Sequence, residues 1–188
     1  GAGQAPPPAS PQGPGARTER MNVEPVYLGL GSNLGDRHAH LAGALASLRA
    51  HPAVHGLRVS AIYESEPWGD AEQPRYYNAV ACLHTTLAPL ALLDLLLSIE
   101  AAHGRVRAPD RRNGPRTLDL DLLAYGERVL DLPRLTLPHP RLAERAFVLL
   151  PLLEGRLEGE HIALPALAES PAASQSWKQL RQLVVGPF

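Results

Sequence analysis

The chain has 188 residues, 45% of them hydrophobic, and a formal net charge of -1 at pH 7. This length predicts one domain with a sizeable core. The balanced charge argues against a general nucleic-acid or membrane-surface binder, which would be basic overall. The single cysteine, Cys82, excludes an internal disulfide framework and a cysteine-rich zinc site. No apolar run approaches the roughly 18 residues that span a bilayer, and no signal-peptide pattern opens the sequence, so a soluble cytoplasmic protein is expected.

The first twenty residues differ in composition from the rest of the chain. They are mostly Gly, Ala, Pro, Gln and Ser, with almost nothing to bury, which is typical of a disordered arm or linker. We therefore expect a single domain over residues 21–188. The sequence leaves open whether residues 1–20 are a tag, a native arm or an interdomain linker.

Hydrophobic periodicity predicts four strands and two helices in the order βαββαβ. The strands are short apolar or alternating runs, and the helices repeat apolar residues every three or four positions. Thr86 is the predicted cap of the second helix, with Pro89 in its first turn. This order indicates a ferredoxin-like α+β fold, in which an antiparallel sheet is backed by two helices. The predicted strands are 26–30, 58–63, 76–85 and 118–123, and the first helix is 36–49.

The pattern weakens after the fourth strand. We expect C-terminal additions to the sheet: a short hairpin beyond Tyr125, a proline-flanked loop and a helix near 140–153. The tail from Gly155 shows little periodicity.

Two acidic residues on the fourth strand are the strongest chemical signal. Asp119 and Asp121 flank Leu120, and residues two apart on a strand project from the same face. Carboxylates roughly 6–7 Å apart repel each other unless cations lie between them. Oxygen ligands of this kind suit Mg²⁺ carried in with a nucleoside triphosphate. The alternative is the solvated edge of a strand.

An arginine-rich loop over residues 104–116 ends just before these acids. Guanidinium groups bind phosphate oxygens with paired donors and stay charged at any working pH. An isolated loop of this kind would be a solvated basic segment, but its place beside paired acids predicts phosphoryl transfer. The arginines are Arg105, Arg107, Arg111, Arg112 and Arg116.

The segment from Gly114 to Leu123 resembles the signature of the hydroxymethyldihydropterin pyrophosphokinases. Similar motifs follow in family order over roughly residues 26–154. The resemblance implies transfer of pyrophosphate from ATP to the hydroxymethyl group of 6-hydroxymethyl-7,8-dihydropterin, leaving AMP, in folate biosynthesis. The other motifs include Gly29-Leu30-Gly31-Ser32-Asn33, Tyr76-Tyr77-Asn78-Ala79, Leu135-Thr136-Leu137-Pro138-His139-Pro140 and Arg145-Ala146-Phe147.

The resemblance also implies roles for individual residues. Asp119 and Asp121 would hold two Mg²⁺ ions along the triphosphate. Together with these acids, the implied catalytic residues are Arg105, Arg107 and Arg116. The residues implied to contact ATP are Glu100, Arg105, Arg112, Arg116, Leu122, Arg134, Thr136, His139 and Arg145. Whether Arg111 or Arg112 reaches ATP stays open, as does whether Glu100 is instead a structural partner of the arginines.

The resemblance also implies a binding site for the pterin ring. A flat bicycle with a donor–acceptor edge requires aromatic faces on both sides and an amide at its rim. Tyr76 and Phe147 match the positions that sandwich the ring, and Asn78 matches the amide. The residues implied to contact the pterin are Ser65, Trp68, Tyr76, Asn78, Asp119 and Phe147.

The sequence is compatible with two rival functions and with one further partner. A ferredoxin-like RNA-binding module would use the arginine loop on phosphates, but acids in the middle of the basic site would repel an RNA backbone. The second rival is a phosphoryl transferase acting on another alcohol. Association or fusion with neighbouring folate-pathway enzymes is the partner expected beyond the two substrates. The histidines at 38, 40, 51 and 55 are interpreted as solvent-facing rather than as metal ligands.

Overall fold

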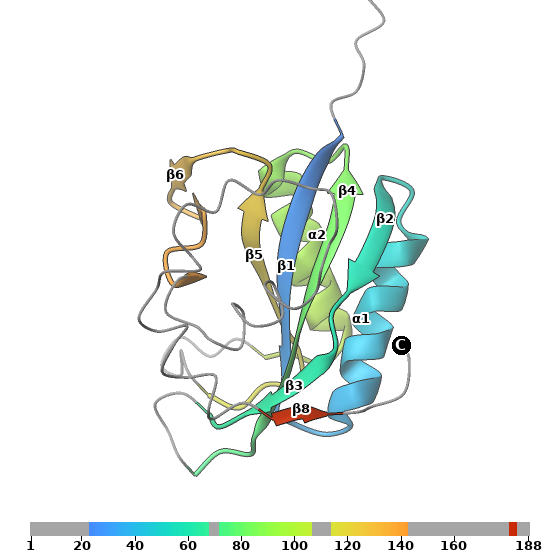
Figure 1. Cartoon of the computed structure of the whole chain (residues 1–188), viewed down its shortest axis with the longest axis vertical. Helices are drawn as coiled ribbons and strands as arrows, with labels where there is room; N and C mark the ends of the chain where they lie inside the picture. The colour runs from blue at the N-terminus through green and yellow to red at the C-terminus, as the bar shows by residue number, and fades with distance from the viewer. Residues whose placement is uncertain (1–22, 68–71, 107–113, 143–180, 184–188) are drawn as a thin grey trace, which may run out of the picture.

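The computed structural model describes residues 23–67, 72–106, 114–142 and 181–183. A six-stranded sheet forms its centre, with helices α1 and α2 on one face (Figure 1). A separate two-stranded sheet pairs β6 with β7. The elements are β1 (Glu24–Ser32), α1 (Arg37–Ala50), β2 (Val54–Val59), β3 (Ile62–Ser65), β4 (Tyr76–Thr85), α2 (Pro89–Ala102), β5 (Asp119–Tyr125), β6 (Leu130–Leu132), β7 (Leu135–Leu137) and β8 (Arg181–Leu183).

The sheet confirms the ferredoxin-like α+β prediction. Its order is β5-β1-β4-β3-β8, β2 pairs with β4 as well, and every pairing is antiparallel. Together β2 and β3 take the place of the single second strand that the sequence predicted. The break falls at Ser60, whose Oγ accepts a hydrogen bond from the backbone N–H of Val80 at 3.0 Å. A side chain thus replaces a backbone group in the ladder, which interrupts the strand.

The two helices begin by different means. Asp36 caps α1 by accepting a hydrogen bond from the N–H of Ala39 at 2.9 Å, a common N-cap contact. The predicted cap of α2 is wrong, because the N-cap is Ala88 without a side-chain bond, while Pro89 starts the helix as expected. Thr85 serves the connection instead, accepting from the N–H of Leu87 at 3.1 Å.

The main core lies between the sheet and the two helices. It contains leucines of both helices, such as Leu45 and Leu96, and the inward residues Leu28, Leu83 and Leu120 of the central strands. Burial of these side chains stabilises the layered arrangement. Because alternate residues of β1, β4 and β5 face this core, the residues between them lie on the opposite face of the sheet.

The C-terminal part holds one confirmed and one unexpected feature. The predicted hairpin beyond Tyr125 is formed by β6 and β7. The tail, which showed little periodicity, contributes β8 at the edge of the main sheet beside β3. The predicted helix near 140–153 falls almost wholly outside the described residues. Among those that are described, no helix is long and apolar enough to cross a membrane.

Candidate active site

Asp119 and Asp121 lie on one face of β5, as the alternation predicted. In the ladder with β1 they pair with Gly31 and Gly29. A Cβ added to Gly31 would lie 3.8 Å from the Cβ of Asp119, and one added to Gly29 would lie 3.7 Å from the Cβ of Asp121. Both acids therefore lie beside a strip of β1 that carries no side chains and leaves space on this face of the sheet.

Gly31 is the floor of a cradle bounded by three predicted pterin residues. A Cβ at this position would meet Asn78 Oδ1 and Tyr76 Cδ1, each at 3.7 Å, as well as Asp119. The Asn78 amide is buried, and its Nδ2 donates to Ser65 Oγ at 2.8 Å and to Tyr63 O at 3.4 Å. These bonds fix the orientation of the amide. The structure thus brings Ser65, Tyr76, Asn78 and Asp119 together.

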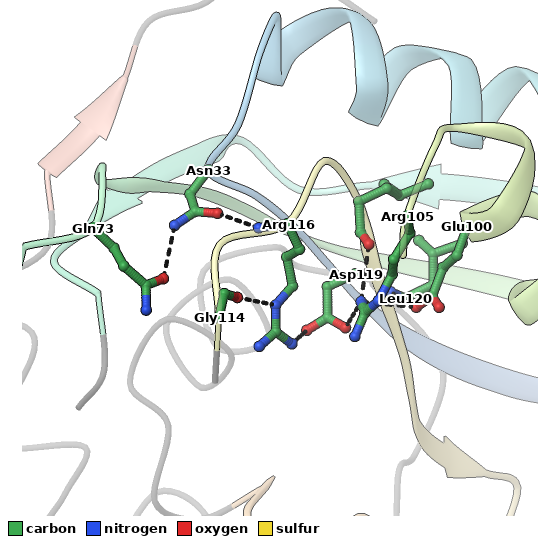
Figure 2. A network of polar contacts seen from close by, with 9 residues as sticks. Asn33, Gln73, Glu100, Arg105, Gly114, Arg116, Asp119 and Leu120 are labelled. Carbon is green, nitrogen blue, oxygen red and sulfur yellow. Dashed lines mark hydrogen bonds and ion pairs between the residues drawn. The ribbon is translucent and has the colours of Figure 1, made fainter. Parts of the chain in front are cut away.

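Two arginines hold Asp119 from opposite sides (Figure 2). Arg116 Nη1 donates to Asp119 Oδ2 at 3.0 Å, and Arg105 Nη1 is bonded to Asp119 Oδ1. Burial alone would lower the pKa of Arg116, but the adjacent Asp119 and Tyr76 raise it overall. Burial raises the pKa of Tyr76, with Arg116 opposing and Asp119 reinforcing the shift. The result is a fixed cationic cluster around one carboxylate.

Glu100 supports this cluster from the end of α2. Its side chain is buried, and Oε1 accepts from the backbone N–H of Leu120 at 2.8 Å and from Arg105 Nη1 at 3.3 Å. Arg105 also donates to the carbonyl of Leu118 at 2.9 Å. These contacts join α2 to β5 and favour a structural role for Glu100. Its contact with ATP stays a prediction.

Asn33 is a residue of the site whose role was not predicted from the sequence. Its Oδ1 accepts from the N–H of Arg116 at 2.7 Å, and its Nδ2 donates to Gln73 Oε1 at 3.3 Å (Figure 2). Its Nδ2 also donates to the carbonyl of Pro74 at 3.1 Å. The amide therefore joins the turn after β1 to the loop before β4 and to the segment that carries Arg116. The signal available in the sequence was an amide that directly follows a buried strand.

A pocket of about 450 Å³ lies between α2, β5 and the β6–β7 hairpin. Asp121 lines it at one end, and four predicted ATP-binding residues line it as well: Leu122, Arg134, Thr136 and His139. The backbone N–H of Arg141 donates to His139 Nδ1 at 3.1 Å. The ring proton of neutral His139 is therefore on Nε2, which is a donor. From α2 the lining residues are Leu93 and Leu97.

Several predicted residues lie outside the described part of the chain. These are Trp68, Arg107, Arg111, Arg112, Arg145 and Phe147. Every other predicted site residue is described, and all of them border the cradle at Gly31, the arginine cluster or the pocket beside Asp121.

The donor set of the two acids fits a hard divalent cation. Mg²⁺ is commonly bound by one or two carboxylates, with water and substrate phosphates completing the octahedron. Asp119 and Asp121 supply two such carboxylates on one face. Among the described residues there is no cluster of three or more metal-binding side chains. Water and substrate phosphates would supply further ligands to a cation held by these two carboxylates.

Comparison with known proteins identifies the family. Residues 27–156 match the profile of the 7,8-dihydro-6-hydroxymethylpterin-pyrophosphokinase (HPPK) family. The chain is 51% identical over 132 residues to the 2-amino-4-hydroxy-6-hydroxymethyldihydropteridine pyrophosphokinase of Pseudomonas aeruginosa, covering 70% of this chain and 80% of that protein. It is 41% identical over 154 residues to the Bacillus subtilis protein of the same name, covering 82% and 90%.

Two further similarities concern longer proteins. The folic acid synthesis protein fol1 of Pneumocystis carinii is 43% identical over 134 residues, which cover 71% of this chain and 18% of that protein. Among solved structures, a triple mutant of Plasmodium falciparum HPPK-DHPS with STZ-DHP has a TM-score of 0.64 at 13% identity. This alignment covers 87% of the present chain and 47% of the other, so the chain spans about half of that structure. At this identity the similarity supports the fold alone.

The relatives and the fold together define a small α+β transferase, in which the paired acids lie between the cradle at Gly31 and the pocket beside Asp121. The chain belongs to the HPPK family. It transfers pyrophosphate from ATP to 6-hydroxymethyl-7,8-dihydropterin in folate biosynthesis, as the resemblance in the sequence implied.

Proposed function

We propose that Asp119 and Asp121 hold Mg²⁺ at the junction of two substrate sites and that the transfer occurs there. The supporting observation is that the two acids face different regions. Asp119 borders the cradle at Gly31, and Asp121 lines the pocket beside the β6–β7 hairpin. Acids two residues apart therefore span the two regions. When bound, the cation would neutralise phosphate charge and align the oxygens of the triphosphate.

In this proposal ATP occupies the pocket beside Asp121. The leucines of α2 and β5 would bury the base, while Arg134, Thr136 and His139 offer donors along the opposite wall. Nε2–H of His139 would donate to a phosphate oxygen. Arg107, Arg112 and Arg145, which lie outside the described residues, would add positive charge.

The pterin would occupy the cradle at Gly31. Asn78, oriented by Ser65, would pair with the edge of the ring, and Tyr76 would cover one face. Trp68 and Phe147 would complete this site. A hydroxymethyl group beside Asp119 would then point toward the phosphates held near Asp121.

The arginine cluster would change partners when ATP binds. Arg105 and Arg116 both contact Asp119 in the present structure. We propose that phosphate oxygens draw these guanidinium groups away, which frees the carboxylate for Mg²⁺. Glu100 would hold Arg105 near its place during this exchange. Positioning and charge neutralisation would then supply most of the rate enhancement, with no covalent intermediate.

The first test is to incubate the protein with ATP, Mg²⁺ and the hydroxymethyl pterin and to separate the nucleotides. We expect AMP to appear only with the pterin present and to stop forming when a chelator is added. Asp119→Asn and Asp121→Asn should each lower kcat by roughly 100-fold or more. Asp131→Asn, at an exposed position of β6, is the matched control and should retain activity. ADP as the product, or full activity in EDTA, would contradict the proposal.

We also propose that residues 21–188 form one catalytic domain preceded by a disordered arm. The composition of residues 1–20 supports this division. A neighbouring folate-pathway enzyme is the partner we propose. The support is that the matching region forms part of a longer chain in the Plasmodium HPPK-DHPS structures and in the Pneumocystis fol1 protein.

A further inference from the structure

Two histidines join helix α1 to helix α2. His40, in the first turn of α1, and His103, the C-terminal cap of α2, have their Nδ1 atoms 3.2 Å apart. The rings meet edge to face, with centroids 5.5 Å apart. This is the geometry of an N–H···N hydrogen bond, in which one Nδ1 donates and the other accepts. Both side chains are partly buried, so the prediction that His40 faces solvent was incomplete.

Packing and protonation state both favour this bond. A Cβ added to Gly43 would lie 2.5 Å from Cε1 of His103, so the His103 ring occupies space that a glycine leaves on α1. His40 Nε2 lies beside Gly35, where an added Cβ would be 3.2 Å away. Burial lowers the pKa of His103, and His40 lowers that pKa further. His103 is therefore neutral at pH 7.5, and the pair retains a nitrogen that can accept.

His103 lies where the chain leaves α2. The N–H of Gly104 donates to the carbonyl of Ala101 at 3.0 Å, and the N–H of Arg105 donates to the carbonyl of Glu100 at 3.1 Å. Gly104 itself has a φ of 75°. Two such bonds around a left-handed glycine form the Schellman motif, which ends many helices. The motif fixes the direction in which Arg105 leaves the helix.

Arg105 then reaches the acids of the candidate active site. Its Nη1 contacts Asp119 and donates to Glu100 Oε1 at 3.3 Å (Figure 2). Only Gly104 separates Arg105 from His103, and a Cβ added to Gly104 would meet none of the described atoms within 4 Å. The connecting residue is thus not packed against the described part of the chain. The position of the Arg105 backbone therefore depends on the residues at either end of this short connection.

We propose that His40 and His103 are positioning residues for the transfer reaction, because the bond between their rings fixes the end of α2 from which Arg105 extends. This inference rests on the role proposed above for Arg105 at the phosphates. When the guanidinium group leaves Asp119 for a phosphate oxygen, it loses one of the contacts that orient it. The bond to α1 would keep the Arg105 backbone in place during that exchange.

The test is steady-state kinetics at pH 7.5 with ATP, Mg²⁺ and the hydroxymethyl pterin. His40→Leu removes the ring nitrogens, and we expect kcat to fall about 10-fold, since small displacements of a catalytic group are costly. His40→Asn places an amide where Nδ1 stood and should restore kcat to within about twofold of wild type. KM for the pterin should stay within about twofold in both variants, because the cradle at Gly31 belongs to the sheet.

A double-mutant cycle shows whether the effect passes through Arg105. Arg105→Ala alone should lower kcat by about 100-fold. In that background His40→Leu should change kcat by less than about twofold, because the group that it positions is already absent. The matched control is His55→Leu, at an exposed position of β2, which should keep the wild-type kcat.

Two results would overturn the inference alone. One is a wild-type kcat in His40→Leu, and the other is the same fold-loss from His40→Leu with and without Arg105. Wild-type activity in Arg105→Ala would instead contradict the role proposed for Arg105 at the phosphates, and this inference with it. Gly43→Ala carries the test if His40→Leu does not fold. It retains both histidines but displaces the His103 ring, and it should give a similar loss of kcat.

Discussion

At the scale of single residues, some positions in the site follow from neighbouring residues in the sequence, while others depend on contacts between distant parts of the chain. Asp119 and Asp121 share a face because a strand alternates, a property of three consecutive residues that the sequence displays directly. The structure confirms that placement. Asn33 could not be assigned in the same way, because its partners Gln73 and Arg116 are 40 and 83 positions away in the chain. Contacts of this kind depend on the completed fold.

Glu100 offers a test between a structural role and a role in binding ATP. Glu100→Ala would leave Arg105 without one of its carboxylates and the N–H of Leu120 without its acceptor. Breaking a buried pair in this way should lower the free energy of unfolding by about 3 kcal/mol. Glu100→Gln keeps an acceptor oxygen and should cost less, about 1 kcal/mol.

The measurement is urea unfolding of both variants, together with KM for ATP. Glu127→Ala, at an exposed position, is the control and should unfold like wild type. An unchanged unfolding free energy combined with a raised KM for ATP would show that Glu100 acts on the nucleotide rather than on the fold.

At the scale of elements, the apolar pattern predicted where strands and helices lie, but side-chain hydrogen bonds decided where they end. The second strand divides because Ser60 Oγ enters the ladder. The helix α2 begins after Ala88 without a side-chain cap, and the threonine that bonds the connecting backbone is Thr85, which accepts from the N–H of Leu87. Ser and Thr can bond the backbone in several local geometries, and the sequence does not say which one occurs.

Tyr125 makes a similar link that can be measured. This residue ends β5, and its hydroxyl donates to the carbonyl of Leu87 before α2 at 2.5 Å. Tyr125→Phe removes that bond and should lower stability by about 1 kcal/mol at pH 7.5. Burial raises the pKa of Tyr125, with Arg128 opposing and Glu24 reinforcing the shift. The folded state therefore loses this proton at higher pH than the unfolded state.

The sign of the pH dependence follows from that difference. The stabilisation that depends on a protonated Tyr125 hydroxyl is fully present below the unfolded-state pKa of about 10. It is lost as the pH rises toward the pKa of Tyr125 in the folded state. Wild type should therefore lose more stability than Tyr125→Phe between pH 9 and pH 11, as measured by chemical denaturation at each pH. Parallel curves for the two proteins would show that this hydroxyl is not coupled to folding.

At the scale of the whole molecule, the fold class could be predicted because the order βαββαβ is carried by long periodic segments. The strand β8 could not, since it has three residues and lies in a tail with little pattern. A strand this short gains its order from its neighbour rather than from its own sequence. Its backbone pairs with Ile62, Tyr63 and Glu64 of β3, so the end of the chain completes an edge that begins about 120 positions earlier.

This edge leads to the pterin side of the site. The strand β3 also carries Ser65, and both Ser65 Oγ and the carbonyl of Tyr63 accept hydrogen bonds from Asn78. The strand β8 forms its ladder with β3. None of the β3 residues in this ladder lines the pocket beside Asp121. Loss of β8 should therefore loosen the Asn78 partners while leaving the nucleotide pocket intact.

A truncation after residue 180 tests this coupling. We expect KM for the hydroxymethyl pterin to rise several-fold, because Asn78 would lose part of its fixed orientation and the ordering would have to occur on binding. KM for ATP should stay within about twofold of wild type, and Tm should fall by a few degrees. Steady-state kinetics with each substrate varied in turn, alongside thermal unfolding, supply the measurements. Removal of residues 1–20 is the matched control and should change neither constant. An equal rise in both KM values would mean that β8 stabilises the domain as a whole rather than the pterin side.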